Sequence, residues 1–523
     1  MIKKFTSILL ILIFILTSAT LCGCSSKNFY LYFAIDTMPY NIDPQKAETY
    51  GELLAVRNCF RGLTKYDKNG NAVLDLAKTY TVSNDGLVYT FTLNDATWGN
   101  GEKVTADDFL FAVERATDPI TASPNSPLLE CISGAAERLN GNTEAVLGIS
   151  SPDPQTIVYT LTKPDSTFLS TLTRAIFMPC NREYFESCGG KYGLDRKHIL
   201  TNGTYYVSQW LTDRHLKLSL AKEVSERQNI AENVFLTVSA KNKTNVQRII
   251  DREVGITVDS LNDYSKIDTS KFTVYASYLK SYCLVINPNT DFGANTNITA
   301  AFAQSINHAR YTVNMSERFK TATTVLPENC IVFDSNIDTL STPKYSFEYD
   351  AEKSRNDFLT ALKELPGKKL PDIQVLTVDS PEIKTILTNI VSQWQSNLGA
   401  YVNIKTVSTE TELNETVNEG NFTIALVPFS GNAYEILKRF SDTSSALYLN
   451  DPKFDLAVQK LHISNDSESA KASVNTCLQI LSDNSRIIPI INTPTAFIYD
   501  IEYENVRFSI IDGTVDFSCI YKK

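Results

Sequence analysis

Apolar residues recur along the chain at two spacings, one typical of strands and the other of helices. Alternation or short apolar runs predict strands over residues 31–35, 88–93, 156–161, 202–206, 216–220, 282–286, 373–378, 402–407, 422–427 and 486–492. Spacings of three and four predict helices over 53–63, 298–310 and 383–398, the last of which ends at Gly399. The strand–helix–strand alternation after Pro371 predicts a parallel sheet covered by helices.

Residues 97–119 form the most informative local stretch. Thr105 is suited to cap a helix, and Asp108 stands three residues on, at the reciprocal position of a capping box. The helix should stop before Pro119, because the residue preceding a proline is disfavoured in the α region. Two roles remain open for Trp98, a core residue or a residue lining a cleft.

The first residues have the pattern of a bacterial secretion signal. Lys3 and Lys4 precede an apolar run over 8–15, which is too short for an ordinary spanning helix. Leu21-Cys22-Gly23-Cys24 follows and is similar to a lipobox, so we expect residues 1–23 to be a signal peptide and Cys24 to be lipidated. Ordinary cleavage that leaves Cys24 unmodified is the alternative. A lipidated chain would lie outside the cytoplasm, anchored to the outer face of the bacterial membrane.

Length and charge narrow the class of protein. With 523 residues, 43% of them hydrophobic, the chain should fold into two or three lobes. The formal net charge of −10 and the absence of a clustered basic run disfavour nucleic acid as a partner. Among the ten cysteines, Cys180 and Cys188 suggest a pair, although spacing alone does not fix connectivity.

Catalytic patterns are scarce. Ser277 and Lys280 match the Ser-x-x-Lys of serine acyl enzymes, but the Lys-Thr-Gly element is missing. The four histidines are scattered without metal-ligand spacing and are expected to be surface or core residues. We therefore expect no enzyme, no cofactor and no metal site.

Short segments throughout the mature chain resemble the extracellular solute-binding proteins of family 5, the oligopeptide-binding type that serves ABC importers. In chain order the matching segments are Asn41-Ile42-Asp43-Pro44, Cys59-Phe60-Arg61-Gly62-Leu63, residues 83–91, residues 98–109, Asp118-Pro119 with residues 121–124, residues 201–205 with Trp210, and Gln393-Trp394 with Asn397-Leu398-Gly399.

This resemblance implies an α/β fold of the periplasmic-binding-protein type (type II, cluster C), with two lobes, a hinge and an extra inserted domain. Lobe I would comprise residues 24–66, 173–282 and 487–523; the inserted domain, residues 67–172; and lobe II, residues 283–486. Residues 282–286 and 487–491 would form the hinge, and the ligand would be buried between the closing lobes.

The resemblance also implies two ligand-binding segments. One contains Glu48, Thr49, Tyr50 and Gly51, where the family offers backbone groups to an extended peptide. The other contains Ser430, Gly431 and Asn432. Asn432 stands where peptide-binding members usually carry an aspartate that pairs with the α-ammonium of the ligand, and Asn125 stands where an aromatic residue is frequent. An amide brings no charge, so these departures bear on whether the ligand has a free amino terminus.

The implied function is that of a monomeric, membrane-anchored lipoprotein that captures extracellular oligopeptides. It would deliver them to the permease and ATPase subunits of an ABC importer. Two alternatives remain: the same fold with a non-peptide ligand, such as an oligosaccharide or a chelated metal, and a surface sensing or interaction protein without a role in transport.

Overall fold

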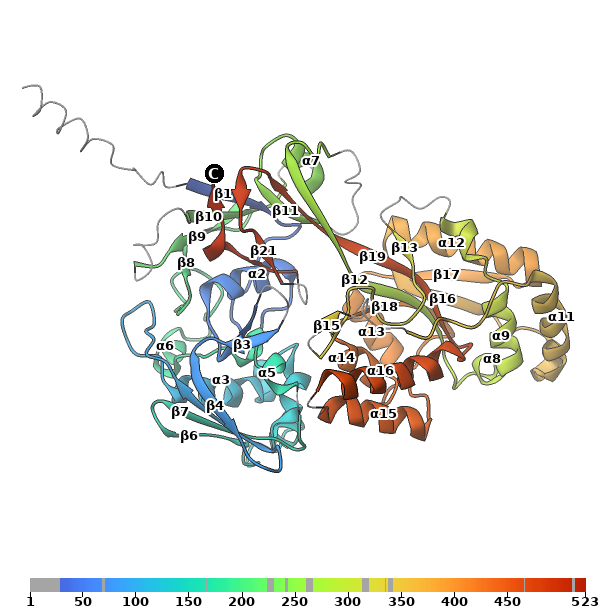
Figure 1. Ribbon diagram of the computed structural model, residues 1–523, viewed down its shortest axis with the longest axis horizontal. Helices are drawn as coiled ribbons and strands as arrows, with labels where there is room; N and C mark the ends of the chain where they lie inside the picture. The colour runs from blue at the N-terminus through green and yellow to red at the C-terminus, as the bar shows by residue number, and fades with distance from the viewer. Residues whose placement is uncertain are drawn as a thin grey trace, which may run out of the picture.

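The computed structural model describes residues 29–67, 71–165, 167–222, 230–239, 243–259, 267–312, 319–333, 335–336, 342–464, 466–509 and 513–523. The expected signal peptide and Cys24 lie outside these residues. Two halves of the molecule stand side by side and are connected by two long strands, β12 and β19 (Figure 1). Among the described helices, none combines the length and apolar character needed to cross a membrane.

One large sheet runs through both halves, in the order β17-β16-β18-β12-β19-β11-β1-β10-β9-β8, with β13 added beside β19. Its strands are β1 (Phe29–Ala34), β8 (Tyr205–Leu211), β9 (His215–Leu220), β10 (Ala231–Thr237), β11 (Ile256–Asp259), β12 (Phe272–Ile286), β13 (Lys320–Thr321), β16 (Ile373–Val378), β17 (Val402–Val407), β18 (Ile424–Ser430) and β19 (Ile487–Asp500). The strands expected from the apolar pattern are thus present, and β16 and β17 have the predicted bounds. Strand β16 pairs in parallel with β17 and with β18, as the strand–helix–strand alternation predicts.

The pairing of β12 with β19 is interrupted between the two halves. Residues 272–277 pair with 495–500 on the lobe I side, and the register shifts between Ser277 and Lys280. Pro494 lies opposite this shift and has no N–H to donate to the ladder. Residues 282–286, which we expected at the hinge, pair with β18 as well as with β19 and are buried inside lobe II. The irregular point, at 277–280 and 493–495, is therefore the place where the connection can bend with least loss of pairing.

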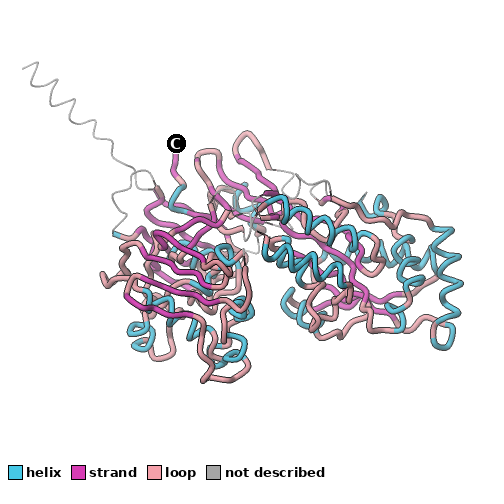
Figure 2. The backbone as a smooth tube through the Cα atoms, turned by 60° about the horizontal axis from the view of Figure 1, so that its bottom comes forward, coloured by secondary structure: helices cyan, strands magenta, loops and turns pink. Residues whose placement is uncertain are grey.

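Helices cover both faces of the lobe II strands, and each face has its own core. Helices α8 (Asp291–Ala294), α9 (Thr296–Gln304), α10 (His308–Thr312), α11 (Ala351–Ala361) and α12 (Pro381–Leu398) belong to one side. The other side has α13 (Glu410–Asn418), α14 (Ala433–Lys438), α15 (Pro452–Ile463) and α16 (Ser467–Ser482). The short strands β14 (Ile331–Val332) and β15 (Ser335–Asn336) form a separate pair. Figure 2 shows how these helices surround the strands.

The helix expected over 298–310 is divided in two, because side chains of α12 satisfy the backbone groups at the break. Gln393 accepts a hydrogen bond from the N–H of Asn307 (2.7 Å), and the Asn397 amide donates to the carbonyl of Ser305 (2.8 Å). Trp394, fully buried, donates to the carbonyl of Phe302 (3.1 Å). The Gln-Trp-x-x-Asn segment noted in the sequence therefore has a structural role: it holds the break between α9 and α10 against α12 inside lobe II.

Lobe I and the inserted domain share one continuous hydrophobic core. The inserted segment contributes the sheet β4-β5-β7-β6, whose strands are Ala77–Val82, Val88–Leu93, Thr156–Thr160 and Ile149–Asp153. Its helices are α3 (Ala106–Ala116), α4 (Ala135–Leu139) and α5 (Phe168–Thr171), and the pair β2 (Thr64–Tyr66) and β3 (Ala72–Leu74) lies at its start. Lobe I adds α2 (Tyr50–Cys59), α6 (Arg182–Ser187), α7 (Asn245–Ile250), and the small strands β20 (Tyr503–Glu504), β21 (Arg507–Phe508), β22 (Val515–Asp516) and β23 (Tyr521–Lys522).

The capped helix expected after Thr105 is confirmed as α3. Asp108 accepts hydrogen bonds from the N–H of Thr105 (2.8 Å) and from the indole N–H of Trp98 (3.1 Å). Burial raises the pKa of this carboxyl to about 6. Trp98 is fully buried, so its core role is confirmed and it does not line a cleft. Cys180 and Cys188 are both free thiols, so the suggested pairing was wrong.

A buried ion pair ties the inserted segment to lobe I. Both terminal nitrogens of Arg115, on α3, donate to the carboxylate of Asp43, each over 2.6 Å. The exposed fractions of the two side chains are 6% and 3%. Burial alone would lower the pKa of Arg115, but the bonds and charge of Asp43 outweigh it and raise that pKa above its usual value. Since Ser123 also donates to the carbonyl of Gln45 (2.6 Å), the chain that leads to Glu48 is fixed against the inserted segment.

Candidate ligand-binding cleft

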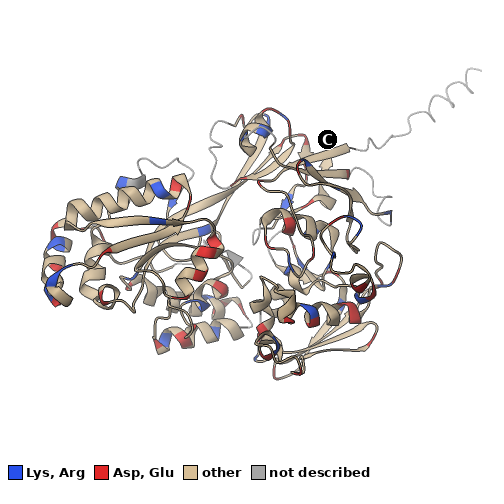
Figure 3. Cartoon of the chain, turned by 180° about the vertical axis from the view of Figure 1, so that it is seen from behind, with Lys and Arg blue, Asp and Glu red and all other residues tan. Residues whose placement is uncertain are grey.

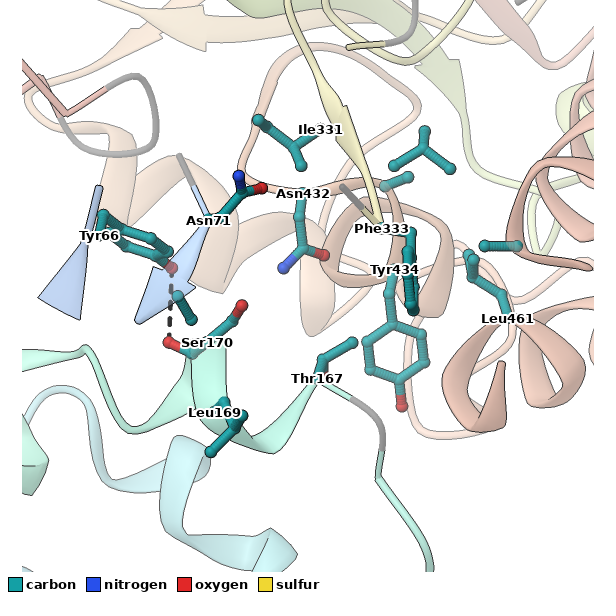
Figure 4. A pocket seen from close by; sticks show the side chains of 14 residues that line it. Tyr66, Asn71, Thr167, Leu169, Ser170, Ile331, Phe333, Asn432, Tyr434 and Leu461 are labelled. Carbon is teal, nitrogen blue, oxygen red and sulfur yellow. Dashed lines mark hydrogen bonds between the residues drawn. The ribbon is translucent and has the colours of Figure 1, made fainter. Parts of the chain in front are cut away.

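Two adjoining cavities lie between the inserted segment and lobe II. The smaller, of about 250 Å³, is lined by Tyr66, Asn71, Ala72, Thr167, Leu169, Ser170, Ile331, Val332, Phe333, Asn432, Ala433, Tyr434, Leu461 and Ala470. The larger, of about 550 Å³, has many charged side chains, and we call it the charged cavity. Thr167, Asn432 and Tyr434 border both. Figure 4 shows the smaller cavity, with Tyr66 and Ser170 on one side and Asn432 and Tyr434 on the other.

Asn432 begins helix α14 and is engaged by that helix. Its side-chain oxygen accepts a hydrogen bond from the N–H of Glu435 (2.9 Å), and the Glu435 carboxylate accepts from the N–H of Asn432 (3.0 Å). This is a capping box, which satisfies backbone donors at the start of a helix. The cap uses one lone pair of the Asn432 oxygen, and the NH₂ group of the amide remains available to donate to a ligand.

Gly431 and Ser430 position Asn432 and are absent from the lining of the two cavities. Gly431 has φ of 116°, and a Cβ there would lie 2.4 Å from a carboxylate oxygen of Glu435. Glycine is therefore required for the Glu435 carboxylate to reach back and complete the cap. Ser430 is the exposed last residue of β18 and pairs with Lys280.

The other expected segment faces lobe II from lobe I, and it also begins a helix with a capping box. Glu52 accepts hydrogen bonds from the N–H groups of Glu48 (3.1 Å) and Thr49 (3.0 Å), and the Thr49 hydroxyl accepts from the N–H of Glu52 (3.4 Å). The exposed carboxylate of Glu48 accepts from the hydroxyl of Thr411 in lobe II over 3.3 Å. The backbone N–H groups of Glu48 and Thr49 are thus already bonded within the chain.

Tyr50 and Gly51 are held within lobe I. The Tyr50 hydroxyl donates to the carbonyl of Gly513 (3.0 Å), in the C-terminal segment. A Cβ on Gly51 would lie 3.0 Å from the carbonyl oxygen of Thr37, so the close approach of that loop requires glycine. Neither residue borders the two cavities. A ligand role for them, as for Glu48, Thr49 and the segment at Asn432, stays a prediction.

Polar contacts bridge the space between the two halves. Arg174 donates to the second carboxylate oxygen of Glu435 (2.7 Å), with exposed fractions of 24% and 32%. Nδ1 of His462, at the end of α15, lies 3.5 Å from the carboxylate of Asp165, and Tyr434 stacks on the imidazole with ring centres 4.4 Å apart. Burial lowers the pKa of His462, although the charge of Asp165 opposes this shift. These contacts join the two halves of the described structure.

Several residues at the cavities were missed by sequence reasoning. Tyr66 and His462 come from distant segments, and neither stands in a pattern that marks a site. His462 was expected to be a surface or core residue, and it is buried, but at the boundary between the halves. The two capping boxes, in contrast, had a signal, since Thr49-x-x-Glu52 and Asn432-x-x-Glu435 both have the required spacing.

Two lobes connected by a pair of long strands, with cavities lying between them, define a hinged solute-binding protein. The family described as bacterial extracellular solute-binding proteins, family 5 (middle region), matches residues 71–445, and the chain belongs to this family. The fold and family expected from the sequence are therefore confirmed.

Individual relatives agree with this assignment. The chain is 27% identical over 463 residues to a dipeptide-binding protein of Lactococcus lactis, covering 84% of each. It is 26% identical over 474 residues to the periplasmic murein peptide-binding protein MppA of Escherichia coli, covering 86% of this chain and 85% of the relative. Among solved structures, Listeria monocytogenes OppA bound to peptide superimposes with a TM-score of 0.74, at 22% identity, over 95% of this chain and 99% of the other. The Escherichia coli murein tripeptide-binding protein MppA gives 0.75 at 21% identity, over 95% and 99%.

Proposed function

We propose that this chain captures peptides outside the cytoplasm and delivers them to the permease and ATPase subunits of an ABC importer. The observation that carries the proposal is the pair of cavities between the lobes of a family 5 solute-binding fold. Relatives that align over more than four-fifths of their length are named as dipeptide- and murein peptide-binding proteins, which favours a peptide over an oligosaccharide or a chelated metal.

Capture would be non-covalent and would depend on lobe closure. A ligand in the smaller cavity touches Tyr66 from one half and Asn432 from the other, so it contributes contacts to both only when the halves are together. Arg174 and Glu435 also meet only in that arrangement. The ligand therefore shifts the equilibrium towards the closed form by the contacts that the open form lacks.

A thermal-shift assay with a pool of short peptides tests this proposal, with oligosaccharides as the comparison ligands. A ligand that binds only the folded state stabilises it by RT ln(1 + [L]/Kd), about 2.7 kcal/mol at a hundredfold excess over Kd. We expect a rise in melting temperature with peptides and none with oligosaccharides. A rise with oligosaccharides alone would assign the fold to a different ligand class, and no rise with either would favour a role without transport.

The protein would act as a monomer, anchored through lipid on Cys24. The anchor at Cys24 is supported by the lipobox-like pattern and the short apolar run before it. Cell fractionation of Cys24→Ser and Cys22→Ser variants distinguishes the two cysteines. Cys24→Ser should move the protein from the membrane to the soluble fraction, and Cys22→Ser should leave it on the membrane. Membrane retention of Cys24→Ser would rule out this anchor.

A further inference from the structure

The outer face of the lobe I sheet carries exposed aromatic side chains at β1, the first strand of the chain. Leu31 and Phe33 of β1 point into the core. Tyr30 and Tyr32 alternate with them and are 55% and 41% exposed. Helix α7 covers this face only further along β1, at Ala34, which clusters with side chains of the helix. Solvent-facing positions of a half-buried strand are ordinarily polar, so two exposed tyrosines in one short strand need an explanation.

Phe235 of β10 lies at the centre of this face. Tyr32 stands directly opposite it in the neighbouring strand and stacks on its ring, with 4.8 Å between ring centres. Tyr30 meets the same ring edge-on, at 6.1 Å between ring centres. The ammonium of Lys217, on β9, lies 5.6 Å from the centre of the Phe235 ring. The two tyrosines therefore belong to a connected aromatic surface with a cation at its side.

A third tyrosine extends this surface to the edge of the sheet. Tyr206 of β8 is 44% exposed and lies in the same row as Tyr30, with two strands between them. The strand order places β1, β10, β9 and β8 at the end of the large sheet opposite to the lobe II strands, and Figure 1 shows them on the side of lobe I away from lobe II. We call this surface the aromatic face: Tyr30, Tyr32, Tyr206, Phe235 and Lys217. None of these residues borders the two cavities of the cleft.

The expected lipid anchor is close to the aromatic face along the chain. Cys24 stands five residues before Phe29, the first residue of β1. Five residues span at most about 18 Å when fully extended. A lipid on Cys24 would therefore keep the start of β1, and with it Tyr30, within about that distance of the membrane surface. Exposed apolar surface of this kind marks a site of interaction with a protein or a membrane, and the short tether favours the membrane.

We propose that the aromatic face rests on the lipid head groups of the membrane that holds the Cys24 anchor. This inference rests on the proposed anchor and adds which side of the protein meets the lipid. Tyrosine combines an apolar ring with a polar hydroxyl and is enriched where a membrane meets water. Lys217 can lay its stem along the aromatic surface and present its ammonium to lipid phosphates. The contact would orient lobe I and keep the cleft, on another side of the molecule, away from the lipid.

Fluorescence quenching by brominated lipids tests this contact in the full lipidated protein. Tyr32→Trp places an indole on the aromatic face. Tyr80→Trp is the matched control, because Tyr80 is 40% exposed and stacks on Phe91 at 5.8 Å in the inserted sheet. Each protein is reconstituted in vesicles of phosphatidylethanolamine and phosphatidylglycerol, with or without bromine on the upper acyl chains. Bromine should lower the emission of Tyr32→Trp, whereas Tyr80→Trp should lose no more than wild type, which measures the background from the native tryptophans.

A second set of variants assigns the contact to the tyrosines of β1. Tyr206→Trp reports from the edge of the aromatic face, and bromine should quench it too. This quenching should fall when Tyr30→Ser and Tyr32→Ser are added together and should persist when Tyr80→Ser is added instead. All the replaced side chains are exposed, so each variant should melt close to wild type. The protein should stay on the vesicles throughout, because its lipid holds it there.

The outcomes separate this inference from the proposals on which it depends. Absence of quenching in Tyr32→Trp, or equal quenching in Tyr32→Trp and Tyr80→Trp, would overturn the contact. A blue-shifted but unquenched emission from Tyr32→Trp would show that protein, such as a second copy of the chain, covers the face instead of lipid. If protein purified from cell membranes carries no lipid on Cys24, the anchor fails and this inference with it. Peptide capture is tested separately by the thermal-shift assay and is unaffected by any of these results.

Discussion

Replacing Asp43 with asparagine should destabilise the protein strongly, because it leaves Arg115 buried without its counter-charge. The change keeps the size of the side chain and removes both 2.6 Å charged contacts. Arg115 is only 6% exposed and lies over the ring of Phe185 at 4.4 Å, so water cannot replace the lost carboxylate. Breaking a buried ion pair by removing one partner costs about 3–5 kcal/mol.

For a unit as large as lobe I with the inserted segment, this cost corresponds to a fall of roughly 5–10 °C in melting temperature. Differential scanning calorimetry of the ligand-free protein measures it. Asp95→Asn is the matched control, since Asp95 is 83% exposed and stands 3.8 Å from Lys103. That pair is exposed, and its loss should shift the transition by no more than about 1 °C. If Asp43→Asn melts as the control does, the pair does not hold the inserted segment to lobe I, and the reasoning from burial is refuted.

Three further variants test the cleft and the pH response. Asn432→Ala should lower the free energy of unfolding by about 1 kcal/mol, measured by thermal unfolding, because it removes the helix cap. Asn432→Asp should keep the cap and strengthen binding of free-amine peptides. Unchanged affinity would mean that Asn432 does not meet the amino end of the ligand. Arg174→Gln should weaken peptide binding, because it removes the ion pair with Glu435 across the cleft. The loss should be only about two- to fivefold, since this pair is partly exposed. Calorimetric affinities equal to wild type would show that the pair does not support closure. Burial lowers the pKa of His308 to about 4. As pH falls, His308 is therefore protonated in the unfolded chain before it is protonated in the folded protein. The neutral imidazole thus contributes its full stability above about pH 6.5, and this contribution is lost as pH falls towards 4. His308→Gln should lose less stability than wild type across that window in pH-dependent unfolding, and parallel curves would exclude a contribution from His308.

Elements with a strong local pattern could be predicted from the sequence. The apolar periodicity predicts both bounds of β16 and β17 and the end of α12, which begins two residues earlier than predicted. Gly399 takes the left-handed conformation that ends α12. The cap at Thr105 was equally local, because the bonds that make it lie within a few residues.

Features set by distant residues could not be predicted in this way. The break between α9 and α10 depends on Gln393 and Asn397, about 90 residues further along the chain. The irregular point in β12 depends on its register with β19, whereas the apolar run identified only that residues 282–286 form a strand. Arg174 and Glu435 are 261 residues apart, and no pattern in either segment indicates the other.

The candidate site shows a similar division. The resemblance to family 5 led to the segments at Glu48 and Asn432, and the structure places both at helix starts that face the opposite half. It did not indicate that Glu52 and Glu435 occupy the backbone N–H groups at these starts. The charges are spread over both halves, with basic and acidic side chains interspersed (Figure 3), so the sequence did not indicate which of them meet at the charged cavity.

Native mass spectrometry after incubation with a defined peptide pool tests the central claim most directly. The account predicts a complex whose added mass equals that of a peptide from the pool, and whose fragmentation releases that peptide. Asn432→Ala, at a residue that lines both cavities from lobe II, should reduce the retained fraction. A protein that retains no peptide from a broad pool, or that retains only a compound without amino-acid fragments, would contradict the claim that the cleft binds peptides.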